Sequence, residues 1–591
     1  MNKKIKTRNQ VIQSGYIFIF FLLMPLIIIS QEVKMIGKVI DESNTPLIGA
    51  TILELGTTNG ATTNFDGEFE IDVASLNSKI EISYIGYTPQ IIKATKDFST
   101  VQMTADVSAL NEVIIIGYGE IKQKDLTGAV SSVPMDEIIS QPSSNIGDAI
   151  QGRAAGVTVI TSGQPGNNPT FRIRGSGTIG NNDPLIVVDG MPLNGGLNQV
   201  NMKDVESFQV LKDASATAIY GARGSNGVII ISTKRGKKGK GTIDIDIFTS
   251  FQQATNVIDV LNADQFATLS NEMLVNGGFT PNPDFSNPSS LGNGTDWLDA
   301  FFTTGRQNNV TLSYAQGNDK SNMFTSLNVF DQDGIIINSE YTRYILQFNS
   351  DTQINEHIKF GNSLKLNYDI KRNGDNNIQN AILSLPTQPI YRDNGNYSGP
   401  IGQPIYSGDI DNPIGKSNIV KNTIKGYNLQ GNVYGELGFL KYLKLKTLLG
   451  VEANFWDTRT WSPSYQWDSD AAPNAYLSES SNKSLTLVWD NTLTFIKEFD
   501  NGSTINAVLG TSAQENQFKF ISGSVQGFPS ESTQTLNNGL LQPTINGSGS
   551  EWSIFSYFAR AQYDYKNKYY LTATIRRDGS SRFGTGNKYG T

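Results

Sequence analysis

The feature that most constrains this chain is a set of long segments in which apolar and polar residues alternate. In IKFGNSLKLNYDI, residues 358–370, most even-numbered positions are apolar and the odd-numbered positions are polar or glycine. The same period of two recurs at 443–455, 485–499, 557–565 and 569–575. Successive side chains of a strand point to opposite faces, and strands of roughly 9 to 11 residues can cross a bilayer. The alternation therefore predicts antiparallel strands with one face toward lipid.

The connections between these segments differ in length in a regular way. Three are short, at 317–321, 353–356 and 566–568, and three are long and rich in Gly, Asn, Ser and Pro, at 372–423, 456–482 and 519–551. A further long connection holds residues 256–277, whose spacing of apolar residues predicts a helix. Short connections at one end of the strands and long connections at the other are typical of outer-membrane β-barrels, which carry their long loops outside the cell.

The number of predicted strands bears on whether the barrel closes. About eleven strands follow Thr242, whereas bacterial single-chain barrels have an even number and plugged outer-membrane transporters have about 22. The final segment, RRDGSSRFGTGNKYGT, does not have the pattern of a terminal aromatic strand. We therefore expect residues 237–591 to be the N-terminal part of a transmembrane β-barrel, truncated in this chain.

Residues 1–30 have the pattern of a secretory signal peptide. Four basic residues lie between positions 3 and 8, and the apolar run Tyr16–Ile29 follows. As a helix rising ~1.5 Å per residue, this run is too short to cross a hydrocarbon core of ~30 Å. A removable signal fits the pattern better than a membrane anchor. Because the chain contains no cysteine, a lipoprotein is excluded.

Residues 31–105 are expected to form a small β-sandwich. Short alternating runs are separated by the turn sequences Asn-Thr-Pro, Gly-Thr-Thr-Asn-Gly and Asp-Gly, which favour a compact antiparallel arrangement. The order GKVIDESNTPLIGATILELGTTNGATTNFDGEFEIDV resembles the carboxypeptidase regulatory-like domain. By that resemblance the domain is non-catalytic.

Residues 126–236 predict a small mixed α/β unit. Apolar, largely β-branched runs predict three strands, at Leu185–Val188, Val205–Leu211 and Val228–Ser232. Between the last two strands, Asp213 can cap a short helix over Ala214–Tyr220. Gly221 can end that helix in a left-handed conformation.

The motifs of this unit resemble the plug domain of TonB-dependent outer-membrane receptors. They are FRIRGSG, PLIVVDG, VESFQVLKD and ATAIYGARGSNGVIIISTKRG, in that order. The closest resemblance is to the SusC/RagA-like branch. It implies a mainly β protein with an N-terminal β-sandwich, a small α/β plug and an incomplete transmembrane antiparallel barrel, in the outer membrane of a Gram-negative bacterium with the N-terminal domain in the periplasm.

A linker at 106–125 joins the two domains and carries an extended, β-branched segment. Its residues Glu112, Val113, Ile114, Ile115 and Ile116 resemble the TonB box, through which these receptors contact an energy-transducing protein of the TonB type. An exposed extended peptide can pair as an added strand with the edge of a partner's sheet, and main-chain hydrogen bonds then provide the affinity. The alternative is that this segment is the last strand of the preceding sandwich.

Composition argues against enzymatic and nucleic-acid functions. The chain has no cysteine and a single histidine, His357, so thiolate catalysis, zinc-thiolate sites and histidine clusters are excluded. The net charge of −8 argues against a nucleic-acid partner. The sequence GSGTIG at 175–180 matches a dinucleotide fingerprint, but turn residues follow where that motif requires a helix. We expect no enzyme activity, no cofactor and no metal.

Two arginines of the plug also invite a functional interpretation. Arg172 and Arg174 would share one face of a strand with a period of two. An acidic ligand is one possible partner, and an acidic lining of the barrel wall is the expected one, with Asp244 and Asp246 as candidates. The two aspartates have no catalytic partner nearby in the sequence, so catalysis at this pair is not expected.

The resemblance implies an importer. By that resemblance, a TonB-type protein would energise uptake of an oligosaccharide or peptide nutrient, and a SusD-like surface lipoprotein would cap the barrel. One alternative is a siderophore or cobalamin receptor. Another is a secreted adhesin or surface binding protein, which would account for the signal peptide and the β-repeats but not for the plug motifs. The identity of the ligand and the residues that bind it are not predicted.

Overall fold

A computed structural model describes residues 33–591 except 43, 58, 85–86, 97, 105–112, 123–127, 140–142, 144, 376 and 401–409. The predicted signal peptide and Glu112 therefore lie outside the described residues. The chain divides into two compact units. One runs to Ile114 and includes Lys122–Lys124, and the other contains Ile115–Ile121 and Asp125–Thr591.

The first unit contains two small sheets packed around one core. One sheet has the order β4 (Glu68–Val73), β1 (Val33–Ile40), β7 (Ser99–Gln102), and the other has the order β3 (Gly60–Thr62), β2 (Thr51–Glu54), β5 (Lys79–Ser83), β6 (Gln90–Lys93). Exposed and buried residues alternate strictly along β4. Its inward Phe69, Ile71 and Val73 join Met35 and Ile52 in the buried cluster. The predicted β-sandwich is confirmed.

The plug has a five-stranded sheet at its centre. Its order is β10 (Val130–Val133), β15 (Val205–Leu211), β16 (Val228–Thr233), β13 (Leu185–Val188), β14 (Met191–Leu193). The predicted strands are present, and β13 and β16 run parallel. The Asp213 side chain accepts a hydrogen bond from the Ala216 N–H at the start of α5 (Ala214–Thr217). Gly221 has φ 67° inside the following 3-10 helix η4 (Ala218–Gly224), so the expected cap and the expected left-handed glycine are confirmed.

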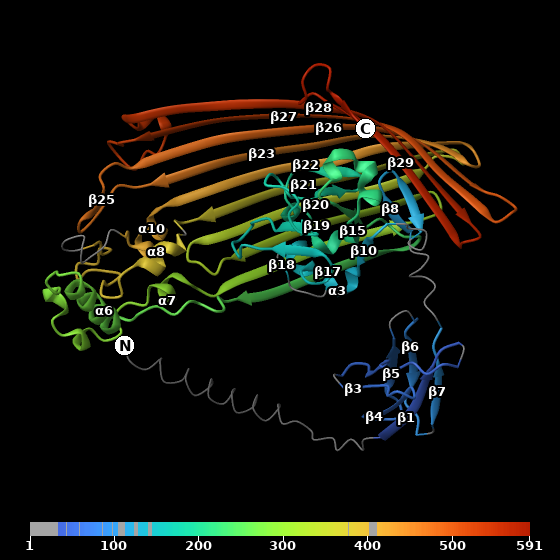
Figure 1. Cartoon of the computed structure of the whole chain (residues 1–591), viewed down its shortest axis with the longest axis horizontal. Coiled ribbons are helices and arrows are strands. Elements are labelled where there is room, and N and C mark those ends of the chain that lie inside the picture. The colour runs from blue at the N-terminus through green and yellow to red at the C-terminus, as the bar shows by residue number, and fades with distance from the viewer. Residues whose placement is uncertain are drawn as a thin grey trace, which may run out of the picture. The chain divides into compact units, whose positions relative to one another are not determined.

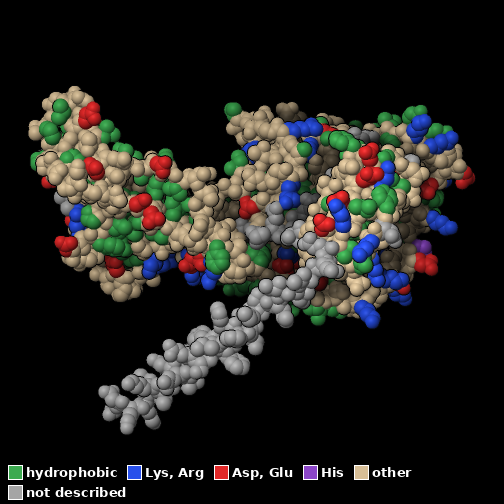
Figure 2. All heavy atoms as spheres, turned by 90° about the horizontal axis from the view of Figure 1, so that it is seen from below, with side chains coloured by type: hydrophobic (Ala, Val, Ile, Leu, Met, Phe, Trp, Pro, Cys, Tyr) green, Lys and Arg blue, Asp and Glu red, His purple; other side chains and the backbone are tan. Residues whose placement is uncertain are grey.

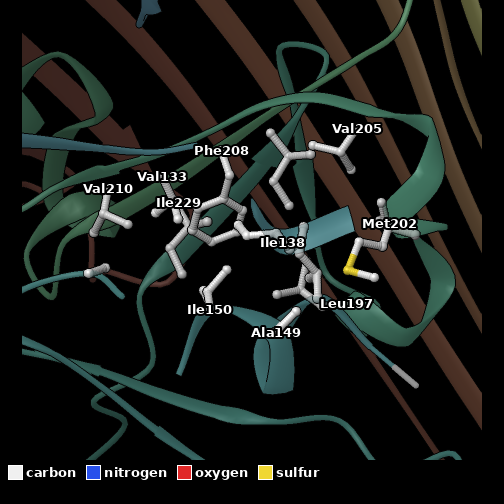
Figure 3. Close-up of a cluster of buried hydrophobic side chains, with 14 of the residues drawn as sticks. Val133, Ile138, Ala149, Ile150, Leu197, Met202, Val205, Phe208, Val210 and Ile229 are labelled. Carbon is white, nitrogen blue, oxygen red and sulfur yellow. The ribbon is translucent and has the colours of Figure 1, made fainter. Parts of the chain in front are cut away.

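Short elements on one side of this sheet complete the plug core, shown in Figure 3. Phe208 and Ile229 of the sheet meet Ile138 and Ile150 there, and all four are buried. The surrounding elements are α3 (Met135–Ile139), α4 (Ile146–Ile150), the 3-10 helices η2 (Leu197–Gln199) and η3 (Met202–Asp204), and a separate hairpin of β11 (Val157–Ile160) and β12 (Thr170–Ile173).

The second unit is dominated by one curved sheet that has twelve strands within the described residues (Figure 1). Every neighbouring pair is antiparallel and the spatial order follows the chain. The strands are β17 (Gly239–Gln252), β18 (Gly305–Gly317), β19 (Ser321–Asp333), β20 (Ser339–Gln353), β21 (Ile358–Asn373), β22 (Lys421–Leu440), β23 (Leu443–Ser462), β26 (Tyr476–Glu498), β27 (Ser503–Gln526), β28 (Leu541–Tyr565), β29 (Tyr569–Ser580) and β30 (Tyr589–Gly590). Eleven are long and β30 has two residues, in accord with the predicted count.

Strand lengths differ from the sequence expectation. Strands β22, β23, β26, β27 and β28 have 20 to 25 residues, about twice the length needed to cross a bilayer. Apolar alternation marks only the part of a strand that meets lipid, whereas main-chain pairing continues into the aqueous region. The long connections are therefore shorter than predicted, because residues such as 476–482 and 541–551 belong to strands.

The two faces of the sheet follow the predicted alternation. On β21, the apolar Phe360 and Leu366 are 47% and 39% exposed and point away from the plug, whereas Lys365 and Asn367 are buried. The plug elements lie on the inner side of the curved sheet in Figure 1. The outer face is therefore apolar and the inner face is polar.

Helical insertions gather at one end of the sheet (Figure 1). They are α6 (Ala263–Asn276), η5 (Pro283–Phe285), η6 (Pro288–Leu291), α7 (Trp297–Phe301), α8 (Ile378–Leu383) and α10 (Pro413–Ile419), and the same rim also carries the hairpin of β24 (Tyr465–Trp467) and β25 (Asp470–Ala472) and the 3-10 helix η7 (Leu536–Asn538). The helix predicted within 256–277 is α6, which begins with a capping box between Asn262 and Gln265. Trp297, Phe301 and Ile414 form a small core among the insertions.

Charge is mixed on the surface seen in Figure 2. Asp and Glu side chains lie among Lys and Arg side chains, with hydrophobic side chains visible between them. No continuous basic patch is visible on that face. Among the described residues, no helix is both long and apolar enough to span a membrane.

Candidate functional site

The plug meets the inner face of the sheet through polar contacts and through two small apolar clusters around Met191 and Ile219. Glu452 of β23 is fully buried, and its carboxylate accepts hydrogen bonds from the backbone N–H groups of Asn194 and Gly195 at 3.1 and 2.9 Å. The Asn194 side-chain amide donates to the same carboxylate at 2.8 Å. A buried carboxylate is tolerated when its oxygens are satisfied by donors. Glu452 therefore holds the loop after β14 against the wall.

A tight turn of the plug makes a second contact of this kind. Val188 and Met191 are paired across β13 and β14, so Asp189 and Gly190 form a two-residue turn, with φ 49° and 84°. The Asp189 carboxylate accepts from the Thr233 N–H and from the Ser363 hydroxyl of β21, both at 2.8 Å. An Asp-Gly pair suits such a turn because both central residues need positive φ. The motif thus places a carboxylate at the wall.

The structure corrects the expected partners of the two plug arginines. Arg172 pairs with Asp183 inside the plug, and Arg174 is exposed and lies past the end of β12 with φ 58°. The left-handed backbone at Arg174 ends the period of two, so the two side chains do not share a face. Asp246 does contact the plug, but through Lys203 at 2.7 Å.

The segment that resembles the TonB box forms part of a hairpin. Val113–Ile116 is strand β8, and it forms a two-stranded sheet with β9 (Gly119–Lys122). In the part of the chain that the structure describes, β8 belongs to neither sheet of the sandwich. The backbone of these residues is therefore extended, as the resemblance implies, while Glu112 lies outside the described residues.

The tip of this hairpin is docked between the plug and the sheet. The Gly117 N–H donates to the Tyr220 hydroxyl at 2.9 Å. The Tyr118 ring stacks on Phe558 of β28, with centroids 4.2 Å apart and planes 18° from parallel. Tyr118 also packs against the buried cluster that contains Ile219 and Phe558. Burial raises the pKa of Tyr118 to about 12, so its phenol is neutral at physiological pH.

The segment that holds the hairpin tip also contacts the loop held by Glu452. Tyr220 and Arg223 both lie on η4. Arg223 donates to Gln514 of β27 and to Asn194, the latter at 3.4 Å, and lies 5.8 Å from the centre of the Trp552 ring. The segment Ala218–Gly224, which is kinked at Gly221, therefore connects the hairpin tip to the loop held by Glu452. The Gly117–Tyr220 and Arg223–Gln514 contacts join residues 103 and 291 positions apart, and no local sequence signal identifies them.

A cavity of about 940 Å³ lies between the plug and the wall, on the side of the long connections. Plug loops around Asn194, Asn181 and Arg223 line one side, and inward residues of β22, β23 and β27, including Asn428 and Trp456, line the other. Within the described residues, no group of three or more His, Cys, Asp or Glu side chains could hold a metal ion.

The two modules of the chain match known families. Residues 35–115 match the CarboxypepD_reg-like domain and residues 122–228 match the TonB-dependent Receptor Plug Domain. A curated relative, TonB-dependent receptor P26 of Formosa agariphila, is 34% identical over 95% of this chain and 57% of its own length. TonB-dependent receptor SusC of Bacteroides thetaiotaomicron is 31% identical over 95% of this chain and 58% of its own length. The chain thus spans somewhat more than half the length of these relatives.

The fold matches solved structures of the same kind. The RagAB peptide importer in its open-open state superposes with a TM-score of 0.71 and 26% identity, covering 81% of this chain and 57% of that one. The closed-closed state gives a TM-score of 0.69 and 25% identity, over 79% of this chain and 56% of that one. Together with the plug, the sandwich and the twelve-stranded sheet, these matches show that the chain belongs to the SusC/RagA-like branch of the TonB-dependent receptors.

Proposed function

We propose that the whole protein is an outer-membrane importer of an oligosaccharide or peptide nutrient, energised by a TonB-type protein acting on Glu112–Ile116. The observation that carries the proposal is the series of contacts from the hairpin tip at Gly117, through Tyr220, to Arg223 beside the cavity. This series connects the extended segment to the loops that face an entering nutrient. The sandwich would lie in the periplasm, where the energy-transducing protein is reached.

The hairpin suits a coupling role for a physical reason. A two-stranded sheet has unpaired main-chain groups on its outer edges, and a partner strand can add there. Force applied to β8 would reach Gly117 and Tyr118 first, because they follow it directly in the chain. Withdrawal of the tip would break the Gly117 to Tyr220 hydrogen bond and unstack Tyr118 from Phe558. The force would then act on η4 and so on the plug.

A SusD-like surface lipoprotein is the proposed partner at the rim of long connections. The rim insertions expose apolar side chains around α6, including Ile258 at 61%, Leu269 at 54% and Met273 at 61% exposure. Contiguous exposed apolar surface marks interaction sites. The position of this apolar surface at the rim suits a partner outside the cell that delivers a nutrient to the cavity.

The coupling proposal is tested with Ile115→Pro in the full-length receptor. Proline removes a backbone donor and fixes φ, so uptake of the nutrient should fall strongly while binding to the purified receptor persists. Ile115→Val keeps the backbone and should leave uptake nearly unchanged.

Three outcomes of this test bear on the proposal. Full uptake by Ile115→Pro would contradict the coupling role of this segment. Retention of nutrient at the cell surface without energy-dependent uptake by the wild type would indicate an adhesin or binding protein instead. Both variants must reach the membrane in wild-type amounts, as measured by heat-modifiable receptor, because a loss of protein would show that Ile115 supports folding.

A further inference from the structure

A small apolar cavity of about 410 Å³ lies on the outer face of the sheet, close to the end of the strands that carries the short connections. This is the end opposite the helical insertions in Figure 1. We infer that this cavity, together with the lysines beside it, binds an anionic phospholipid of the inner leaflet of the outer membrane. An acyl chain would occupy the cavity, and the lysines would bind the phosphate. The inference goes beyond the proposed import function and does not depend on it.

Small side chains aligned on three neighbouring strands form the floor of the cavity. Ala507, Ala561 and Ala573 lie directly opposite one another on β27, β28 and β29, and all three line the cavity. Val508 points inward, where it is buried beside Ile219 of the plug. Since successive side chains of a strand point to opposite faces, the three alanines face outward, toward lipid.

Larger side chains flank this row of alanines on both sides. Toward the short connections, the next outward row contains Tyr563 and Leu571, and on the other side the next row contains Leu509 and Ile575. Phe495 of β26 continues the alanine row and closes its end. Leu509 and Ile575 are 60% and 62% exposed, so the resulting trough is open at the surface that faces lipid.

The direction and the lining of the trough suit an acyl chain. Strands of transmembrane barrels are tilted by about 35–45°, so a trough that crosses them is inclined to the membrane plane rather than lying in it. Surrounding lipid is as apolar as the wall, and association therefore depends on close packing. A chain in the trough contacts the protein on three sides, whereas a chain on a flat wall contacts it on one, and each added atomic contact contributes dispersion energy.

An exposed lysine lies at the side of the trough nearest the short connections. Lys497 of β26 is in the same row as Tyr563, two residues from Phe495, which is about 6 to 7 Å along a strand. Its Nζ lies 5.0 Å from the centre of the Phe499 ring and 5.5 Å from the centre of the Tyr442 ring, so cation–π contacts hold it there. In a phospholipid only a glycerol unit separates the phosphate from the acyl chains, so this short spacing suits one lipid molecule.

Two further lysines lie at the connection between β28 and β29. The Lys566 Nζ is 5.1 Å from the centre of the Tyr565 ring, and the Lys568 Nζ is 6.0 Å from the centre of the Tyr569 ring. Lys497, Lys566 and Lys568 are exposed and form no ion pair within the described part of the chain. These cations are therefore available to a phosphate.

Main-chain hydrogen bonds hold the short connections next to one another. The Ile496 N–H donates to the Tyr442 carbonyl oxygen at 2.9 Å, and the Lys566 N–H donates to the Gly502 carbonyl oxygen at 2.7 Å. The connections that follow β22, β26 and β28 therefore form one continuous edge of the wall. Lysines that are far apart in the sequence are thereby brought to one surface.

The charge and position of this edge indicate the class of lipid. It carries four exposed lysines against two acidic residues, namely Lys441, Lys497, Lys566 and Lys568 against Glu498 and Asp500. Cations near a membrane surface attract anionic lipids. Because the long loops of an outer-membrane barrel lie outside the cell, this edge meets the inner leaflet. An anionic phospholipid fits there, whereas lipopolysaccharide would lie at the opposite end of the strands.

The test titrates phosphatidylglycerol into the full-length receptor purified in a non-ionic detergent, and native mass spectrometry measures the fraction of receptor that carries lipid. Ala507→Leu fills the floor of the trough and should weaken binding about fivefold or more, because the acyl chain loses packing contacts. Lys497→Gln removes one cation and should weaken binding about fivefold.

Each variant has a matched control on its own strand. Ala513→Leu also changes an outward alanine of β27, since Ala513 is paired with Trp489, which is 53% exposed. Lys483→Gln removes an exposed lysine from the half of β26 nearer the long connections. Both controls should leave binding unchanged. Heat-modifiable receptor is measured for every variant, and Ala561→Leu replaces Ala507→Leu where assembly of the latter falls.

The outcomes distinguish a phospholipid site from other associations. Weaker binding of phosphatidylglycerol by Ala507→Leu and Lys497→Gln, with neither control affected, would support the site. Competition by inorganic phosphate without an effect of Ala507→Leu would show an anion site that holds no acyl chain and would overturn the inference. Equal losses in the controls, or a preference for lipid A over phosphatidylglycerol, would also overturn it. None of these results bears on nutrient uptake, so the importer role would stand in each case.

Discussion

The docking of the hairpin tip can be tested by removing a single oxygen atom. Tyr220→Phe deletes the acceptor of the Gly117 N–H, which lies 2.9 Å away, and keeps the ring. An intramolecular hydrogen bond contributes about 1 kcal/mol net, which corresponds to about a fivefold shift between docked and released hairpin.

Hydrogen–deuterium exchange measured by mass spectrometry reports this shift directly. Exchange through local opening follows the population of the open state, so amides of the 113–122 peptide should exchange about fivefold faster in full-length Tyr220→Phe than in the wild type. Tyr118→Ala should give a larger increase, because it loses the stack on Phe558 and the burial of the ring. Tyr569→Phe, at a tyrosine that is 63% exposed, is the control.

The result that would refute this reasoning is specific. If Tyr220→Phe left exchange of the 113–122 peptide at the wild-type rate, the contact at Gly117 would not hold the hairpin. If Tyr220→Phe had a larger effect than Tyr118→Ala, the hydrogen bond rather than the aromatic stack would be the main anchor. An increase that extended equally to plug peptides around Phe208 would show a general loosening of the plug instead of release of the tip.

Three other perturbations follow from single contacts. Leu366→Arg places a cation on the lipid-facing side of β21 at a cost of about 2 to 4 kcal/mol, so heat-modifiable receptor in membranes should fall, whereas Leu366→Ala should assemble. Burial raises the pKa of Asp204 to about 6, so its contribution to plug stability is full below about pH 3.8 and is lost as pH rises through 6. The melting temperature of the receptor should therefore fall over this pH range, and Asp204→Asn should remove the fall. A melting temperature with the same pH dependence in Asp204→Asn and the wild type would contradict this prediction. If the proposed SusD-like lipoprotein binds at the rim, Met273→Asp should reduce its co-purification, whereas Glu272→Gln should not.

Local patterns in the sequence predicted the elements and faces well. The alternation around Leu366 correctly assigned its outward side, and the positions of Asp213 and Gly221 predicted a cap and a helix end that the structure contains. Each of these depends on residues within one strand or one turn. The interactions that form these elements join residues close together in the sequence, so the local sequence pattern is enough to predict them.

Contacts between the plug and the wall could not be predicted in the same way. Glu452 and Asn194 are 258 positions apart, and nothing in the sequence near either residue distinguishes it from other polar residues of an inner face. Acidic wall residues do meet the plug, but Asp246 pairs with Lys203, Asp351 pairs with Arg235 and Glu452 binds backbone N–H groups, whereas Arg172 pairs inside the plug. The Asp-Gly turn at 189–190 was visible in the sequence, whereas its contact with Ser363 depends on the register of the sheet.

The polar contacts between the plug and the wall have a mechanical consequence. Hydrogen bonds from Asn194 to Glu452 and from Ser363 to Asp189 can be exchanged one at a time for bonds to water, so each step changes the free energy by about 1.5 to 3 kcal/mol, the range for hydrogen bonds to charged groups. A wholly apolar interface would separate only when a large contact area was exposed to water in one step. A partner pulling on the hairpin would therefore break these polar contacts in small increments, whereas the buried apolar contacts that Met191 and Ile219 make with the wall would separate in larger steps.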